Sequence, residues 1–264
     1  MTDYLFGFFV LLLGLSFGSF ANVCIYRIPR NMSLVKPRSS CPDCKTPIKP
    51  WHNIPILSFI VLRGKCLTCG AKISWRYPLV ESLTTLLFLF AYYDIYFNNN
   101  NLYLLIIALY LSFVFLLIFF IDLDFRIIPD SLSLTGIIVG FCASLLPDTP
   151  LKWHESLIGL LVGGLLFLAV AELGDRIFKK ESMGGGDIKL AAMLGAFLGW
   201  KGILLVLGLA SFLGASIGGM LLIIAKDKES ARTVPFGPFL VTAALIVFYR
   251  GNEIIQAYLE FIGR

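Results

Sequence analysis

Long apolar segments recur through this chain of 264 residues, and they limit what it can fold into. Hydrophobic residues make up 58% of the chain and charged residues only 15%, whereas soluble domains are about 25% charged. A bilayer core about 30 Å thick requires roughly 20 apolar residues in each spanning helix. The sequence therefore predicts an all-α polytopic membrane protein with about eight transmembrane helices, at residues 4–25, 79–97, 102–122, 131–147, 156–174, 187–200, 202–225 and 235–250.

Positive residues in the connecting segments predict which side of the membrane each connection faces. Lys and Arg concentrate in cytoplasmic loops. They occur here in the connections 26–78, 123–130, 175–186 and 226–234, which we expect to be cytoplasmic. Lys201 and Arg250 go against this alternation. The segment 4–25 should remain as an anchor, because no Lys or Arg precedes it and no small-residue cleavage site follows it.

The basic surplus belongs to one connection. Ten Lys and Arg residues lie between Arg27 and Arg76, against the single acid Asp43. Nucleic-acid binding could explain such a loop, but its place between two hydrophobic segments makes the positive-inside rule the better explanation. We therefore expect contact with the lipid bilayer and no nucleic-acid partner.

Four cysteines in the same loop form two pairs, Cys41-Pro-Asp-Cys44 and Cys66-Leu-Thr-Cys69, with 21 residues between the pairs. Two such pairs can supply four thiolates in the tetrahedral arrangement that Zn²⁺ prefers. Two disulfides are the alternative, which a reducing cytoplasm disfavours. Because four cysteines leave no open coordination position, the sequence predicts a structural zinc ion in a small cytoplasmic zinc-knuckle loop domain.

Three aspartates compete for a functional role near the end of the third apolar segment. Asp122 ends the apolar run and is best placed to line an interior cavity, since a carboxylate at a helix centre in hydrocarbon costs about 2.5–3.5 kcal/mol. Asp124 would point about 200° away on a helix, toward headgroups or the loop. Asp130 follows a proline and is expected to cap the next helix. A local role stays open for Asp122, as a helix-end acid satisfied by Arg126.

A further acid, Asp187, follows Gly184, Gly185 and Gly186 and opens a helical run. Three glycines allow positive φ angles and close backbone approach, so that an extended peptide or a water molecule could reach the carboxylate. Lys189 could stabilise the ionised form of Asp187 or anchor the helix at the membrane interface. The alternative is that Asp187 only caps a helix after a flexible linker.

Asp122 and Asp187 both fall at span ends predicted to face the cytoplasm. Two carboxylates that approach closely share a proton, so the ionised member can activate water while the protonated member polarises an amide. This predicts a peptidase that forms no covalent intermediate. A serine or cysteine peptidase has little support, because the only histidines, His52 and His154, are predicted on opposite sides of the membrane.

Several motifs, in a fixed order, carry a resemblance that covers almost the whole chain. They are Gly18-Ser-Phe-Ala-Asn22-Val-Cys-Ile-Tyr-Arg-Ile-Pro29, the four cysteines, Asn53-Ile-Pro-Ile-Leu-Ser58, Leu62-Arg-Gly-Lys-Cys66, Ile73-Ser-Trp-Arg-Tyr-Pro-Leu-Val-Glu81, Asp122 with Ile128-Pro129-Asp130, Gly184-Gly185-Gly186-Asp187-Ile-Lys189, and Val234-Pro-Phe-Gly-Pro238. On these motifs the chain resembles the bifunctional type IV prepilin peptidases/N-methyltransferases, which are aspartyl proteases of the GxGD type.

The resemblance implies that Asp122 and Asp187 are the catalytic pair. It implies that prepilins or pseudopilins are cut after a glycine, at the cytoplasmic face of the bacterial inner membrane. The new N-terminus is then methylated with S-adenosylmethionine, and members with the cysteine loop generally carry this second activity. The expected organisation is a first transmembrane helix (1–25), a methyltransferase-associated zinc domain (26–78) and a peptidase core (79–264).

The residues themselves reveal no site for S-adenosylmethionine, because no Gly-x-Gly-x-x-Gly follows a strand. Arg76 and Glu81 could hold the amine or the cofactor, or they could be an interfacial anchor and a helix-start acid. The competing functions are a peptidase without methyl transfer, an ion-coupled transporter with paired acids, and a zinc-bearing membrane scaffold. The sequence does not predict the oligomeric state.

Overall fold

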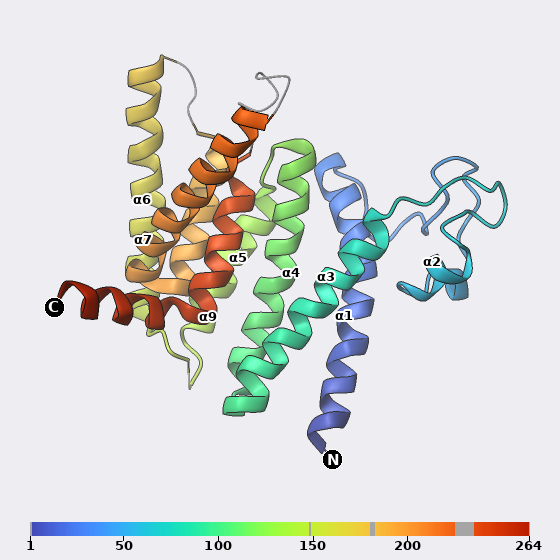
Figure 1. The fold of residues 1–264 in the computed structure, drawn as a ribbon, viewed down its shortest axis with the longest axis horizontal. Helices are drawn as coiled ribbons and strands as arrows, with labels where there is room; N and C mark the ends of the chain where they lie inside the picture. The colour runs from blue at the N-terminus through green and yellow to red at the C-terminus, as the bar shows by residue number, and fades with distance from the viewer. Residues whose placement is uncertain (1, 148, 180–182, 225–234, 264) are drawn as a thin grey trace. The chain divides into compact units, whose positions relative to one another are not determined.

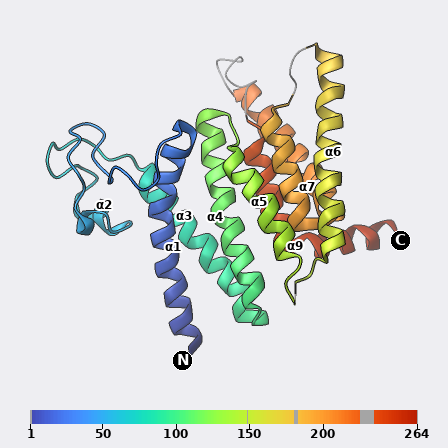
Figure 2. The same cartoon turned by 180° about the vertical axis from the view of Figure 1, so that it is seen from behind.

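The computed structural model describes residues 2–147, 149–179, 183–224 and 235–263. Within these ranges the regular structure is helical, and the only β pairing is two isolated bridges. The chain forms two compact units, Met1–Leu117 and Ile118–Arg264, whose boundary lies inside one long helix, α4 (Figures 1 and 2).

The first unit contains the N-terminal helix pair and the basic loop between its members. Its elements are α1 (Thr2–Arg27), η1 (Ile28–Arg30), η2 (Pro50–His52), α2 (Leu57–Val61), α3 (Arg76–Ala91), the π-helical turn η3 (Tyr92–Phe97) and most of α4 (Leu102–Phe125). The span predicted at 4–25 matches α1, and the one predicted at 79–97 matches α3 with η3.

Small residues let α1 and α3 approach closely. A Cβ atom on Gly14 would lie 2.8 Å from the Thr85 Cα, and one on Gly18 would lie 2.6 Å from the Glu81 Cα. Glycines at such crossings allow backbones to meet, as in other membrane helix pairs. The Asn22 side-chain amide adds a hydrogen bond to the Tyr77 carbonyl, at 3.1 Å. The pair is therefore held by both close packing and a polar cross-link.

Arg27, at the end of α1, holds the start of the basic loop. Its guanidinium donates hydrogen bonds to the Ser33 carbonyl at 2.8 Å and the Pro37 carbonyl at 2.6 Å. The side chain is buried, and a buried charge needs such partners. The loop is therefore fixed to α1 as it leaves the helix.

The second unit is a bundle of helices. It contains the end of α4, α5 (Asp130–Ala143), α6 (Trp153–Phe178), α7 (Gly185–Ile224) and α9 (Gly237–Ile262). Six helices of the described chain are long and apolar enough to cross a membrane, and α5 is a shorter apolar helix of 14 residues. The predicted all-helical membrane class is confirmed.

The longest helix, α7, is interrupted at Gly199, where φ is 69° and ψ is 178°. The chain reverses there, so both ends of α7 lie at the same end of this unit (Figures 1 and 2). We call residues 185–198 the first leg and residues 200–224 the second leg. The two separate spans predicted at 187–200 and 202–225 match these legs. With the legs counted separately, the described helices give about eight crossings.

The first leg of α7 packs directly on α6. A Cβ on Gly195 would collide with the Gly159 carbonyl, and one on Gly163 would collide with the Ala191 carbonyl. The buried Ser156 hydroxyl donates to the Ala196 carbonyl at 2.7 Å. This crossing anchors the first leg, whose N-terminal end carries Asp187.

Within the second unit, the end of α4, the end of α6 and the starts of α5, α7 and α9 gather at one end (Figure 1). Together with the end of α7, these are the helix ends joined by the connections 123–130, 175–186 and 226–234. Residues 180–182 and 225–234 of these connections lie outside the described residues. The helix α9 continues past the predicted end at residue 250 to Ile262.

Candidate active site and cysteine cluster

Asp122 lies in the last turn of α4 and exposes only 5% of its surface. Its Oδ2 accepts a hydrogen bond from the backbone N–H of Gly237, at 3.0 Å. Gly237 is the first residue of α9, and a Cβ at this position would collide with the same carboxylate oxygen. A glycine is therefore required where α9 begins, so that its backbone can reach the acid. Asp124, two residues on, is exposed, as predicted.

Asp187 is the third residue of α7 and is half-buried. Its backbone N–H donates to the Gly184 carbonyl at 3.0 Å, which closes a turn at the start of the helix. Gly186, which precedes Asp187, and Gly237, which donates to Asp122, both lie against the side chain of Ile128. The N-terminus of a helix also favours a negative charge. The structure thus brings together the two acids that the sequence singled out.

Ile128, in the connection between α4 and α5, fills the space around these acids. It is buried, and it lies against Gly186, where an added Cβ would be 3.0 Å from its own Cβ. It also lies against Gly237, where an added Cβ would be 3.3 Å from its Cδ1. One apolar side chain therefore contacts the starts of both α7 and α9, and it limits water around the carboxylates.

Asp130 and Lys189 form an ion pair beside this site. The ammonium group of Lys189 lies 2.7 Å from each carboxylate oxygen of Asp130. The residue that precedes α5 as its N-cap is Pro129, and no side-chain capping bond is formed there. The prediction that Asp130 caps α5 is therefore wrong, because a lysine from α7 takes its carboxylate. Lys189 pairs with this acid instead of Asp187, and it ties α5 to α7.

The four cysteines of the basic loop converge in the first unit. Their sulfur atoms all lie within 4.8 Å of one another. Cys41 and Cys69 are separated by 3.9 Å, and Cys44 and Cys66 by 4.0 Å. A tetrahedral zinc ion with Zn–S bonds of about 2.3 Å would place its sulfurs roughly 3.8 Å apart. The donor set and its spacing therefore fit Zn²⁺.

Each cysteine pair is presented by a tight turn of the same design. In the first turn, the Cys41 N–H donates to the Thr46 carbonyl and the Lys45 N–H to the Cys41 carbonyl. In the second, the Cys66 N–H donates to the Ala71 carbonyl and the Gly70 N–H to the Cys66 carbonyl. The isolated bridges Ser40–Pro47 and Lys65–Lys72 close the two turns. The two turns therefore have equivalent backbone hydrogen bonds, which is the arrangement expected of two zinc knuckles.

Hydrogen bonds make part of this cluster ready to ionise. The side chain and then the backbone of Thr46 lower the pKa of the Cys44 thiol to about 6. Backbone hydrogen bonds from Cys69 and Thr68 lower the pKa of the Cys66 thiol. Because thiolates are the form that binds metal, one sulfur from each knuckle is prepared for it.

Arg76 and Glu81, the two weak candidates for cofactor binding, both lie in the first two turns of α3. Glu81 is buried, and its Oε2 accepts a hydrogen bond from the Ile56 backbone N–H at 2.7 Å. This contact joins α3 to the cysteine loop. The local sequence does not predict this contact, although Glu81 and Ile56 both fall within motifs of the resemblance.

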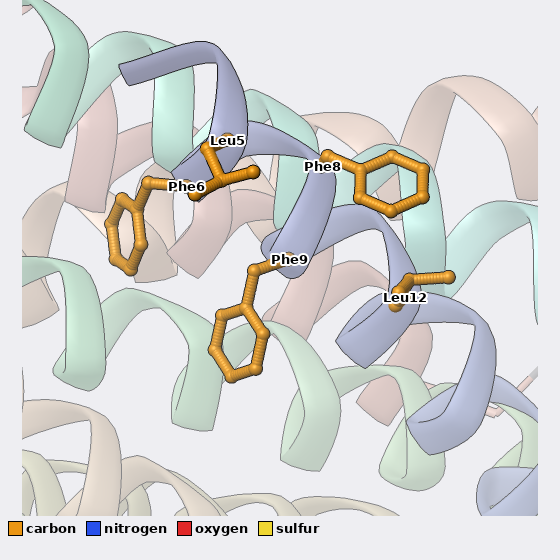
Figure 3. Close-up of a pocket in the computed structure, with 5 residues that line it drawn as sticks. All are labelled: Leu5, Phe6, Phe8, Phe9 and Leu12. Atoms are coloured by element: carbon orange, nitrogen blue, oxygen red, sulfur yellow. The ribbon is translucent and has the colours of Figure 1, made fainter. Parts of the chain in front are cut away.

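A hollow at the N-terminal half of α1 offers no comparable chemistry. Its lining carries no charged or polar side chain and consists of Leu5, Phe6, Phe8, Phe9 and Leu12 (Figure 3). The leucines and Phe8 and Phe9 are exposed, as expected for a helix surface that faces lipid.

Comparison with known proteins divides the chain at nearly the same place as the fold. Residues 12–95 match the Bacterial Peptidase A24 N-terminal domain, which covers the cysteine cluster. Residues 108–219 match the Type IV leader peptidase family, which covers Asp122 and Asp187. The membrane helices and these two matches thus define a membrane-embedded peptidase of the A24 class.

Individual relatives narrow the family further. The chain is 36% identical to the prepilin leader peptidase/N-methyltransferase of Pseudomonas aeruginosa, over 96% of this chain and 93% of that protein. It is 35% identical to that of Legionella pneumophila, over 95% and 93%, and 42% identical to that of Myxococcus xanthus, over 87% and 67%. No solved structure matches. The chain belongs to the prepilin leader peptidase/N-methyltransferase family, as the resemblance implied.

Proposed function

We propose that this chain cleaves the leader peptide of prepilins or pseudopilins after a glycine and then methylates the new N-terminus. The observation that carries the peptidase assignment is the placement of Asp122 and Asp187, which come from two different helices and whose neighbours Gly237 and Gly186 pack against the same side chain, Ile128. The names of the relatives support the substrate class and both activities.

In the proposed cleavage, one carboxylate is ionised and the other is protonated, because two neighbouring negative charges repel. The ionised carboxylate takes a proton from water, whose oxygen attacks the glycine carbonyl carbon. The protonated carboxyl donates its proton to the carbonyl oxygen. As the C–N bond breaks, the first carboxyl protonates the departing nitrogen and the second recovers a proton from a hydroxyl. Both acids return to their starting states.

The Gly237 N–H supports this assignment. It donates to Oδ2 of Asp122, and a hydrogen bond to the charged form of a carboxylate favours that form. Ile128 keeps the surroundings of the pair apolar.

We assign the zinc-knuckle loop to methyl transfer in a structural role. Cys41, Cys44, Cys66 and Cys69 would hold Zn²⁺ with no open coordination position, so the metal would fix the loop without binding substrate. When bound, S-adenosylmethionine supplies the methyl group for the new terminal amine. The Glu81 carboxylate, one of the two candidates for binding that cofactor, already bonds the Ile56 backbone.

We place the protein in the bacterial inner membrane, with the aspartate pair at the cytoplasmic face. The support is the positive-inside pattern, together with the clustering of the helix ends next to Asp122 and Asp187 at one end of the second unit (Figure 1). A prepilin would present its positively charged leader on that side. The lipid bilayer is the second partner.

The mass of the N-terminus of a co-expressed pilin tests both activities at once. Asp122→Asn and Asp187→Asn should each lower the rate of leader removal by about 10²–10⁴-fold, the usual contribution of general acid–base catalysis. Asp124→Asn is the matched control, because Asp124 is exposed and lies only two residues from Asp122. If both substituted enzymes cut as well as the parent does, the pair is not catalytic.

A further inference from the structure

Glu81 is a buried acid that peptide cleavage does not use. It exposes 8% of its surface in the second turn of α3, and its Oε2 accepts the Ile56 N–H at 2.7 Å. Ile56 belongs to the loop that carries the four cysteines. A carboxylate removed from water requires donors of this kind, and hydrogen bonds to a charged acceptor are the stronger ones. This hydrogen bond therefore fixes the cysteine loop to the membrane helix α3.

The backbone that Glu81 holds is strained. Ile56 has φ 62° and ψ −50°, a region that β-branched residues avoid. The Leu57 N–H donates to the Pro55 carbonyl at 2.6 Å, which makes this a γ-turn of the rare, strained type. Such a conformation persists only where the surroundings enforce it. The hydrogen bond to Glu81 lies at the central residue of the turn.

The same point of α3 is fixed from its other side by α1. A Cβ on Gly18 would lie 2.6 Å from the Glu81 Cα, and the Asn22 amide donates to the Tyr77 carbonyl one turn earlier. The α1 backbone, the α3 backbone and the cysteine loop therefore meet at Glu81. A shift of the loop at this junction would move the knuckles relative to the helix pair.

We infer that Glu81 is a positioning residue for methyl transfer, which sets the Ile56 turn and so places the cysteine loop on the α1–α3 pair. This inference rests on the proposed methyltransferase function. It differs from direct binding of amine or cofactor by Glu81, because the acceptor oxygen matters here and the negative charge does not.

Two substitutions separate these roles. Glu81→Gln keeps an oxygen that can accept the Ile56 N–H, whereas Glu81→Ala removes it. We expect Glu81→Ala to slow methyl addition by roughly 10- to 100-fold, because the Ile56 N–H loses its acceptor. The rate of methyl addition by the Glu81→Gln enzyme should stay close to that of the parent enzyme. Leu86→Ala, on the exposed face of the same helix, is the matched control. The measurement is the methylated and cleaved mass of a co-expressed pilin.

A second-site change tests the turn itself. Glycine adopts positive φ without strain, so Ile56→Gly should restore methylation to the Glu81→Ala enzyme. The inference is overturned if Glu81→Ala methylates normally, if Glu81→Gln loses as much as Glu81→Ala, or if Ile56→Gly restores nothing. It is also overturned if Glu81→Ala loses leader cleavage, since the role would then extend to the whole fold. A parent enzyme that cuts without methylating would instead contradict the proposed function.

Discussion

A single amide group, the N–H of Gly237, connects the start of α9 to the carboxylate of Asp122. This contact joins residues 115 positions apart in the chain, and it leaves no space for a side chain. At the residue scale, the site therefore depends on the absence of a side chain at position 237 as much as on the carboxylate of Asp122. Alanine would keep the N–H but add a methyl group where the carboxylate oxygen lies.

Gly237→Ala should consequently displace Asp122 and slow leader cleavage by about 10²-fold, the loss that a misplacement of about 1 Å can cause. Gly208→Ala is a suitable control, because an added Cβ there would meet nothing within 4 Å. The measurement is the rate of leader removal at equal amounts of membrane-inserted enzyme. Unchanged cleavage by Gly237→Ala would mean that the contact is not needed for the reaction.

At the scale of elements, the first leg of α7 is positioned by its crossing with α6. Gly159 and Gly163 on α6 lie against the carbonyls of Gly195 and Ala191, which leaves no room for larger residues. Without a hydrophobic driving force between helices in lipid, packing of this closeness supplies much of their association. The crossing therefore determines the position of Asp187 along the axis of the helix bundle.

Gly195→Ala should force α6 and α7 apart and destabilise the second unit by about 1–3 kcal/mol, as overpacking does in other interiors. We expect a lower thermal midpoint in detergent and a matching loss of cleavage. Gly218→Ala, in the second leg of α7, has open space for its methyl group and should change neither. Equal midpoints for the two enzymes would contradict the close crossing.

At the scale of the molecule, the two proposed activities fall in different compact units. The cysteine cluster lies in Met1–Leu117, and the aspartate pair lies in Ile118–Arg264. Among the described residues, Asp122 accepts from the Gly237 N–H and the Asp187 N–H donates to the Gly184 carbonyl, whereas the backbone bonds of the knuckles are local. Neither set therefore takes these hydrogen bonds from the other. The chemistry of cleavage and that of methylation should therefore be separable.

Removal of zinc with a chelator should abolish most methylation, because a structural metal stabilises the loop that binds it. Leader cleavage should stay within about twofold of its starting rate, because the aspartate pair lies in the other unit. Cys41→Ser should reproduce the effect, and Cys142→Ser, outside the cluster, should not. Re-addition of Zn²⁺ should restore methylation to the parent enzyme. A parallel loss of cleavage would show that the units act as one.

The sequence predicted the features that depend on local pattern. Apolar length indicated the helices, spacing indicated the cysteine cluster, and the angle between Asp122 and Asp124 indicated which of the two is buried. The features it did not predict depend on partners far along the chain. Asp130 looked like a cap because its neighbours favour one, but its carboxylate bonds Lys189, 59 residues away. The Ile56 turn has no local signal, since isoleucine disfavours that conformation.

The interruption of α7 at Gly199 decides whether the chain crosses the membrane an even or an odd number of times between Asp122 and Gly237. Were α7 a single straight crossing, its far end would deliver the chain to the opposite face of the membrane. The segment that begins at Gly237 would then start on the wrong side to reach Asp122. A reversal at one glycine, with φ at 69°, makes the number of crossings between the two residues even. The meeting of Gly237 with Asp122 is therefore decided by a turn at the opposite end of the bundle.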